Sequence, residues 1–343
     1  MKKTKKELDK INYGFSMLKM LLAFEVVLGH FCEWKQYDSL VMWPFRELVS
    51  ISVPCFMIMS FYLMTKSLLV RDDSKFKNRL VRLVVPLFGW AIIYWVVMII
   101  LDVVFHSGIH VGIHNLLWQA FTGHDTILNP SMWYQLNIIF INIIFYYLFK
   151  KFGNKKGYIA LVILMLICYA LQYSGINYML FKDLRFELKW PLGRFAEMIP
   201  YAVIGVTLKY FDVYEKLKKY RFIIMPLCVV LFLFGFSIPW HEMDDFYFSG
   251  LCKPYLALWV ITFAYYAPLE YFSYSLKKLM LLFSNFTLGI YCIHRLVNYL
   301  LMVFKPNLPM LSFEKCILIY ALSYAICYFI NLIPNKYAKS LVN

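Results

Sequence analysis

The sequence predicts an all-α protein, a polytopic membrane bundle of about ten transmembrane helices with both termini on the cytoplasmic side. Of its 343 residues, 62% are hydrophobic and only 16% are charged, whereas a soluble globular domain carries nearer to a quarter charged residues. Apolar runs recur from one end of the chain to the other. We therefore expect residues 1–343 to form one integral-membrane domain, with cytoplasmic tails at about residues 1–12 and 334–343.

Apolar runs of roughly 17–25 residues are long enough to cross a bilayer. Ten runs reach this length, and residues 157–174 are the weakest of them because that run is short and a mixed segment follows it. The sequence shows no internal repeat. The predicted spans are 13–34, 47–66, 83–105, 131–149, 157–174, 191–210, 222–239, 252–270, 279–303 and 316–333.

The loops between the spans predict their orientation, since cytoplasmic loops carry an excess of lysine and arginine. With ten spans, all the strongly basic segments fall on one side, so that this side and both termini are predicted to be cytoplasmic. The longest loop on the other side, residues 106–130, contains no lysine or arginine. The basic segments are the two tails and the loops at 66–82, 150–156, 216–221 and 277–278.

The formal net charge of +15 does not indicate a nucleic-acid partner, because the basic residues lie in short loops between apolar spans. Such loops suit the anionic headgroups of a lipid bilayer. The eight cysteines lie mostly within hydrophobic runs and form no CxxC pair. They predict neither a disulfide framework nor a zinc site.

The first span carries a lysine and a histidine eleven residues apart, Lys19 and His30. Eleven steps of about 100° make almost a whole number of helical turns, so the two side chains share one face and lie about 16 Å apart along the axis. Titratable groups inside an apolar span are costly and indicate function. His30 can take a proton from a hydroxyl; a core histidine bonded to a neighbouring helix is the alternative. Glu33 either orients His30 or lies at headgroup level.

The third and ninth spans hold the other candidate residues. Arg79 and Arg82 are helical neighbours at the cytoplasmic mouth of the third span. Guanidinium groups bind phosphates in a bidentate fashion, although ordinary positive-inside anchoring also explains two arginines there. His294 and Arg295 lie deep in the ninth span with Tyr291 one turn away, and a second buried histidine beside a buried cation indicates a functional site.

Several polar positions are open to two interpretations. Pro54 should kink the second span, where Ser60 either donates a functional hydrogen bond or is satisfied within an apolar core. Arg194 and Glu197 open the sixth span as an internal ion pair or an interfacial salt bridge. Trp133 opens the fourth span and most simply belongs to the aromatic belt.

The outer loop contains three histidines spaced four apart, His106, His110 and His114. On a helix they would share a face and could bind a metal ion. Gly108 and Gly112 disfavour a helix at this place. We therefore expect no metal site.

Taken together and in this order, these segments resemble the acyltransferase 3 family of integral-membrane acyltransferases, over almost the whole chain. The family opens with a basic residue, ten intervening positions and a histidine, which match Lys19 and His30, with lysine replacing the commoner arginine. Its paired arginines before a proline match Arg79, Arg82 and Pro86.

Three further motifs of the family have counterparts. A tryptophan opening the fourth span matches Trp133. A late Ser-Tyr-x-x-Tyr-Leu-x-His signature is similar to the segment from Thr287 to His294, in which Tyr291 and His294 match. A Pro-x-Phe-Phe-x-x-Ser-Gly-type segment matches in part, with Phe61 replacing the usual glycine. The partial matches in that segment are Pro54, Phe56, Met57 and Ser60.

The resemblance implies a multi-pass enzyme of the bacterial cytoplasmic membrane that modifies polysaccharides of the cell envelope. Its donor would be acyl-CoA, usually acetyl-CoA, and its acceptor a hydroxyl of a glycan or glycolipid. Arg79 and Arg82 would bind the phosphates of coenzyme A, and the pantetheine arm would pass Lys19. His30 would act either as a general base or through an acyl-imidazole.

The remaining candidate residues complete this expected site. His294 or Arg295 would stabilise the oxyanion or simply hold the bundle together. The acceptor would contact residues near the outer end of the bundle. These expected acceptor-binding residues are Glu33, Trp133, Tyr291 and Arg295.

Two other functions fit an all-helical membrane protein. A transporter or flippase for a lipid-linked saccharide would suit ten spans with buried charges, but such proteins more often show inverted repeats and helices broken in both halves. A non-catalytic sensor or scaffold leaves the series of motifs unexplained. Homo-oligomerisation is compatible with the sequence.

Overall fold

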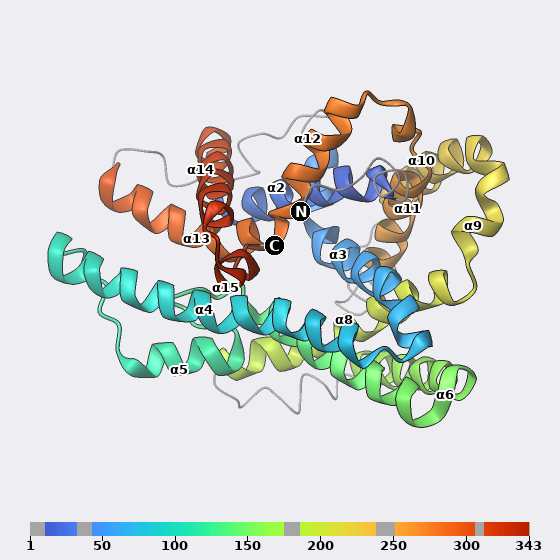
Figure 1. Ribbon diagram of the computed structural model, residues 1–343, viewed down its shortest axis with the longest axis horizontal. Helices are drawn as coiled ribbons and strands as arrows, with labels where there is room; N and C mark the ends of the chain where they lie inside the picture. The colour runs from blue at the N-terminus through green and yellow to red at the C-terminus, as the bar shows by residue number, and fades with distance from the viewer. Residues whose placement is uncertain (1–10, 33–42, 175–185, 238–250, 306–311, 343) are drawn as a thin grey trace.

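The computed structural model describes residues 11–32, 43–174, 186–237, 251–305 and 312–342, and every regular element within them is helical (Figure 1). The predicted all-α class is confirmed for this part of the chain. The longer helices are α2 (Tyr13–Phe31), α3 (Trp43–Val70), α4 (Asp73–Phe105), α5 (Ile113–Thr122), α6 (Trp133–Tyr173), α8 (Phe186–Tyr210), α10 (Arg221–Ser237), α11 (Lys253–Tyr266), α12 (Tyr274–Asn285), α13 (Thr287–Phe304) and α14 (Phe313–Leu332). The short ones are α9 (Val213–Leu217), η2 (Lys218–Tyr220), η5 (Leu269–Tyr271) and α15 (Lys336–Ser340).

Six of the described helices are long and apolar enough to cross a bilayer. The predicted count of ten spans is therefore not confirmed, and the cytoplasmic position of the termini stays a prediction. α10 and α11 have 17 and 14 residues, fewer than the roughly 20 that a hydrocarbon core requires. The six segments are Tyr13–Phe31, Ile51–Val70, Asp73–Phe105, Trp133–Gln172, Thr287–Phe304 and Phe313–Leu332.

The 41-residue α6 covers two of the predicted spans, the fourth and the fifth. Its backbone leaves the helical region at Gly153, which has a φ of 75° and a ψ of −179°, a conformation that is essentially restricted to glycine. A Cβ added to Gly157 would lie 3.1 Å from the Cα of Phe149. In a straight helix, eight residues advance the chain by about 12 Å. The chain after Gly153 therefore turns back against the chain before it.

The predicted ninth span, 279–303, is two helices. α12 ends at Asn285 and α13 begins at Thr287, because Phe286 between them has a φ of −97° and a ψ of 9°.

The predicted outer loop contains a helix, α5, that its composition does not reveal. Asn115 and Gln119 are buried on α5 and bond to the segment that follows it, since the amide of Asn115 donates to Asp125 over 3.1 Å.

Two hydrophobic cores lie side by side in the bundle. One is built mainly from α3, α6, α8 and α11, and the other from the later half of α2 with α4, α13 and α14. A few half-buried side chains pack against both cores, among them Phe56, Leu83 and Tyr291. These residues mark the boundary at which the candidate site lies.

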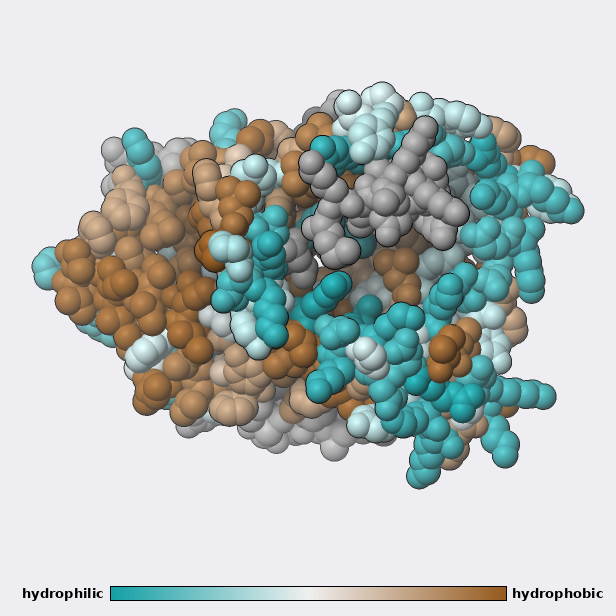
Figure 2. All heavy atoms as spheres, viewed as in Figure 1, coloured by the Kyte–Doolittle hydropathy of each residue, from teal (hydrophilic) through white to brown (hydrophobic). Residues whose placement is uncertain are grey.

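Hydrophilic and hydrophobic residues gather at opposite ends of the face drawn in Figure 2. Hydrophilic residues cover the end where α6 and α9 lie, and hydrophobic residues cover the end where α13 and the last turns of α4 lie. Three of the predicted basic loops, at 66–82, 150–156 and 216–221, belong to the hydrophilic end. The cytoplasmic location of the basic loops stays a prediction.

α3 and α8 pack more extensively than any other pair of helices among the described residues. A Cβ at Gly205 of α8 would lie 2.3 Å from the carbonyl oxygen of Ile58 and 3.0 Å from the backbone nitrogen of Tyr62. Small residues permit such close backbone approach between membrane helices. The α3–α8 contact therefore depends on glycine at position 205.

Gly205→Val should lower the free energy of unfolding by about 1–3 kcal/mol, because α8 must move away from the backbone of α3. Thermal unfolding in detergent measures this loss. Gly193→Ala on the same helix is the matched control, since its added Cβ meets no atom within 4 Å. Equal melting temperatures for Gly205→Val and the wild type would contradict the close contact.

Candidate active site

His30, at the end of α2, contacts residues from two distant parts of the chain. Its Nε2 lies 3.2 Å from the Oγ of Ser131, in the segment leading into α6, and its Nδ1 lies 3.0 Å from the Nη2 of Arg295 on α13. Its ring stacks on that of His294, with centroids 5.3 Å apart and an interplanar angle of 16°. His30 is an exposed residue, whereas His294 is fully buried. The structure thus brings together three residues that the sequence singled out.

Arg295 bridges His30 and Ser131. Its Nε donates to the Oγ of Ser131 over 2.9 Å, while its Nη2 reaches Nδ1 of His30. The guanidinium carbon lies 5.9 Å from the centre of the Phe31 ring. We call His30, Ser131, His294 and Arg295 the histidine cluster. It combines a titratable imidazole, a hydroxyl and a cation within hydrogen-bond distance.

The segment before α6 holds Ser131 in place by its backbone. The Ser131 amide donates to the side chain of Asn129 over 3.0 Å, and the Ser131 carbonyl accepts a hydrogen bond from the hydroxyl of Tyr291. Asn129 in turn donates to the carbonyl of Cys292 over 3.0 Å. The position of Ser131 is therefore tied to α13 at two points.

Tyr94 of α4 inserts its hydroxyl into one turn of α13. The hydroxyl donates to the carbonyl of Cys292 over 2.8 Å and accepts from the backbone nitrogen of Leu296 over 2.9 Å. These two backbone groups would bond directly to each other in an uninterrupted α-helix, and an inserted side chain opens such a turn. His294 and Arg295 lie within this turn, so Tyr94 helps to set their positions.

Tyr94→Phe should lower the free energy of unfolding by about 1–3 kcal/mol, because it leaves the buried backbone nitrogen of Leu296 without an acceptor and removes one of the two donors to the carbonyl of Cys292. If the turn closes instead, Arg295 moves relative to His30 and the activity falls. Thermal unfolding and activity are measured together. Tyr337→Phe, at a side chain that is 55% exposed, is the control. A Tyr94→Phe variant unchanged in both measurements would contradict this role.

Lys19 and Arg79 line one open-sided cavity of about 230 Å³ at the boundary of the two cores. Arg79 points into the bundle, where its Nε donates to Asn142 over 2.6 Å and its Nη2 donates to the Oγ of Ser60 over 2.7 Å. The remaining walls are mostly apolar. Other lining residues include Phe56, Met59, Leu83, Tyr134 and Thr287.

The structure does not bring Arg82 to this cavity. Arg82 is exposed on α4, whereas Arg79 is half-buried against α3 and α6. Residues three apart differ by about 60° around a helix axis, which is enough to direct one side chain inward and the other outward. The expected pair of arginines is therefore one inward cation that shares the cavity with Lys19 and one outward cation.

Tyr291 connects the cavity with the histidine cluster. It lines the cavity, and its hydroxyl donates to the carbonyl of Ser131. Its ring lies 6.2 Å from that of His294 and meets the ring of Tyr134 edge to face at 5.5 Å. The inner wall of the cavity is thus one side of the histidine cluster.

The other predicted acceptor-binding residues are less closely placed. Trp133 is half-buried, and the guanidinium of Arg194 lies 6.0 Å from its ring. Arg194 pairs with Glu197 over 2.5 Å, and Glu197 also contacts Lys253 over 3.3 Å, so this ion pair is internal to the protein. Glu33 lies outside the described residues.

The three outer histidines do not lie on one helix. His106 ends α4 in a left-handed conformation and Gly108 has a φ of 71°, as the two glycines in this loop led us to expect. His110 pairs with Asp102 over 2.8 Å, and His114 is exposed at the start of α5. Within the described parts of the chain, no group of three His, Cys, Asp or Glu side chains is placed to hold a metal ion.

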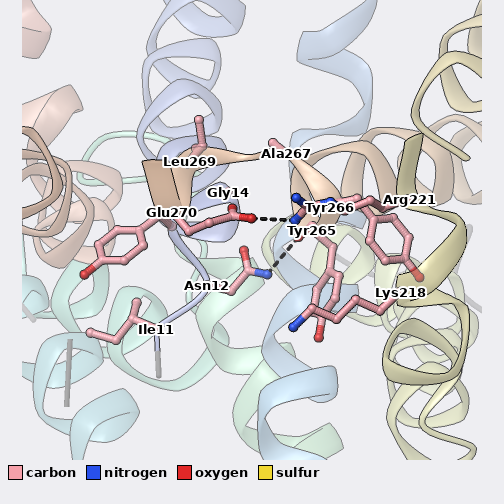
Figure 3. Close-up of a pocket in the computed structure, with 11 residues that line it drawn as sticks. Ile11, Asn12, Gly14, Lys218, Arg221, Tyr265, Tyr266, Ala267, Leu269 and Glu270 are labelled. Carbon is pink, nitrogen blue, oxygen red and sulfur yellow. Dashed lines mark hydrogen bonds and ion pairs between the residues drawn. The ribbon is translucent and has the colours of Figure 1, made fainter. Parts of the chain in front are cut away.

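A second pocket, of about 190 Å³, lies where α2 begins (Figure 3). Lys218 and Arg221 line it together with Tyr265 and Tyr266, and Arg221 pairs with Glu270 over 2.5 Å. Partial burial acts to raise the pKa of the Glu270 carboxyl, but hydrogen bonds from its own backbone and from Arg221 outweigh it and hold that pKa below its ordinary value. This pocket shares no lining residue with the cavity that contains Lys19 and Arg79.

Sequence reasoning missed four residues that shape the site: Ser131, Tyr94, Asn129 and Asn142. Asn142 carries a usable signal, because amide side chains inside an apolar span must find partners. Ser131 and Asn129 carry none, since such residues are common in loops. Tyr94 is one of 27 tyrosines, and only the three-dimensional contact distinguishes it.

Comparison with protein families matches residues 12–332 to an acyltransferase domain, that of the acyltransferase 3 family. No curated protein and no solved structure matches the chain. The matched region includes the histidine cluster and the whole cavity lined by Lys19 and Arg79. Because the match covers nearly the entire sequence, the chain belongs to the acyltransferase 3 family of membrane proteins.

Proposed function

We propose that this protein transfers an acyl group, in our expectation acetyl, from cytoplasmic acyl-CoA to a hydroxyl of a cell-surface glycan or a lipid-linked saccharide. Family membership makes acyl transfer the activity, and the proposal adds the donor, the acceptor and a bacterial cytoplasmic membrane as the location. One observation supports this proposal most strongly. A cation-lined cavity ends at Tyr291, whose hydroxyl bonds to the segment that holds Ser131 beside His30.

The cavity suits the donor in charge and in length. Lys19 and Arg79 offer two positive groups to the phosphates of coenzyme A, and exposed Arg82, three residues further along α4, adds charge that attracts an anion. The mostly apolar walls suit the pantetheine arm. Lys19 and His30 are about 16 Å apart along α2, so phosphates bound near Lys19 place the thioester toward the histidine cluster.

The histidine cluster suits the chemistry of transfer. His30 acts as a general base on the acceptor hydroxyl, a role that typically contributes about 10²–10⁴-fold to the rate. Arg295, within hydrogen-bond distance of His30, donates to the oxyanion that forms at the thioester carbonyl. A transient acyl-imidazole on His30 is the alternative covalent route.

His294 and the residues around it complete the proposed site. Buried His294 supports the ring of His30 by stacking rather than meeting a substrate. Tyr291 and Trp133 form the walls between which donor and acceptor approach, and Glu33 is proposed to contact the acceptor.

Transfer of radiolabelled acetyl groups from acetyl-CoA in proteoliposomes tests the proposal. The purified protein and a lipid-linked saccharide should give a labelled saccharide, and the same preparation with His30→Ala should not. Movement of an unacetylated saccharide across the membrane would instead identify a transporter. Mass analysis of surface glycans from cells with and without the protein then identifies the acceptor.

A further inference from the structure

The contact with Arg295 determines which nitrogen of His30 carries hydrogen. A guanidinium group can only donate hydrogen bonds, and Nη2 of Arg295 lies 3.0 Å from Nδ1 of His30. A hydrogen on Nδ1 would place donor against donor, so Nδ1 carries the lone pair. In the neutral imidazole the hydrogen then lies on Nε2.

Ser131 is placed to receive that hydrogen. Its Oγ lies 3.2 Å from Nε2 of His30 and also accepts from Nε of Arg295 over 2.9 Å. Both acceptor positions of the hydroxyl oxygen are then used. In this tautomer His30 cannot take the hydrogen of Ser131, so the serine is not an activated nucleophile.

We propose that Ser131 is a positioning residue that fixes His30 with its hydrogen on Nε2, so that Nδ1 is the basic nitrogen and Arg295 covers it until the acceptor hydroxyl arrives. This inference rests on the proposed acyl transfer. It gives Ser131 the orienting role that sequence reasoning offered to Glu33. The base in an acyl-transfer site is ordinarily oriented by a third group in this way.

Arg295 has two functions in this arrangement. Its Nε stays bonded to Ser131, while its Nη2 gives up Nδ1 of His30 to the acceptor hydroxyl. The freed N–H remains next to the reacting atoms and can donate to the developing oxyanion. The hydrogen bond to Ser131 thus keeps Arg295 in place while its Nη2 changes partner from His30 to the oxyanion.

The transfer step balances without another reactant. The acceptor oxygen bonds to the thioester carbonyl carbon as its proton passes to Nδ1. The C–S bond then breaks, the thiolate of coenzyme A leaves, and the proton on Nδ1 passes to the sulfur. Nε2 keeps its hydrogen bond to Ser131 throughout.

Two variants of Ser131 separate positioning from folding. Ser131→Ala should lower kcat by about 10²-fold, the scale of a misplaced catalytic group, and leave KM for the donor unchanged because Ser131 does not line the donor cavity. The backbone ties to Asn129 and Tyr291 stay in place. Ser131→Thr keeps the hydroxyl and should restore most of the activity. A normal kcat for Ser131→Ala, or an acyl group attached to Ser131 in mass spectrometry, would overturn the inference.

Nitrogen NMR of histidine-labelled protein measures the tautomer directly. The resonances of His30 are those lost in His30→Gln. In the wild type, Nδ1 should have the shift of an unprotonated ring nitrogen and Nε2 that of a protonated one, and Ser131→Ala should give a mixture of tautomers. The reverse assignment in the wild type would overturn the inference.

The proposed acyl transfer and the role of Ser131 can be rejected separately. The NMR measurement needs neither donor nor acceptor, so it reports on His30 even if no acetyl transfer occurs. The expected tautomer in a protein without transferase activity would reject the proposed function alone. Active protein with hydrogen on Nδ1 would reject the role of Ser131 alone.

Discussion

Replacement of His30 by alanine should abolish acyl transfer and leave the amount of folded protein unchanged. The loss should reach about 10²–10⁴-fold, the usual contribution of a positioned base. The fold should survive because His30 is an exposed residue and because Arg295 still bonds to Ser131 without the imidazole. Acetyl transfer in proteoliposomes and the elution profile in detergent measure the two effects.

The control for this variant is His106→Ala, which removes an exposed histidine at the end of α4 and should have little effect. His30→Gln retains a hydrogen-bonding side chain but no base and should be as inactive as alanine. Retained glycan acetylation in cells that produce only His30→Ala would count heavily against the assignment. A metal-dependent loss of activity in His106→Ala would instead indicate a functional metal site in the outer loop.

Replacement of Arg79 by alanine should raise the KM for acyl-CoA by about 10- to 100-fold, which corresponds to the loss of one charge-assisted hydrogen bond of about 1.5–3 kcal/mol. Arg79 lines the cavity, so we expect its guanidinium to turn from Ser60 and Asn142 toward a bound phosphate. The change in kcat should be smaller, because Arg79 is remote from the reacting atoms. Donor titrations of initial rates measure both constants.

The matched control is Arg82→Ala, three residues further along α4. It removes the same charge from an exposed position, and its effect on KM should be small and should disappear at high salt. Arg79→Lys should recover part of the affinity, since the charge remains but the planar fork is lost. Equal effects of the two alanine variants would show that the cavity is not the donor site.

The long apolar runs predict the helical class. The cost of burying polar groups within these runs indicates the main candidate residues. His30, His294 and Arg295 stand out in the sequence for this reason, and the structure places them in contact. Arg79 and Arg82 illustrate the limit of the same reasoning. Helical spacing puts both arginines on one stripe, but only packing decides which of them faces the protein.

The number of spans and the partners of the cluster could not be predicted in this way. Hydropathy does not show whether a helix of 14 residues such as α11 crosses a bilayer, whereas it does predict a loop at 150–156, where the chain reverses at Gly153. Tyr94 and Ser131 contact α13 across long stretches of sequence, and periodicity describes only neighbours within one helix.

The edge-to-face pair of Tyr134 and Tyr291 has a consequence for the membrane itself. Substrates that approach from opposite sides require routes from both aqueous phases, and a continuous water path would discharge the proton gradient. Both rings line the cavity beside the histidine cluster, and we expect them to act as a permeability barrier between turnovers. Proteoliposomes with Tyr291→Gly should lose an imposed pH gradient faster than those with wild-type protein, and equal decay would place the barrier elsewhere.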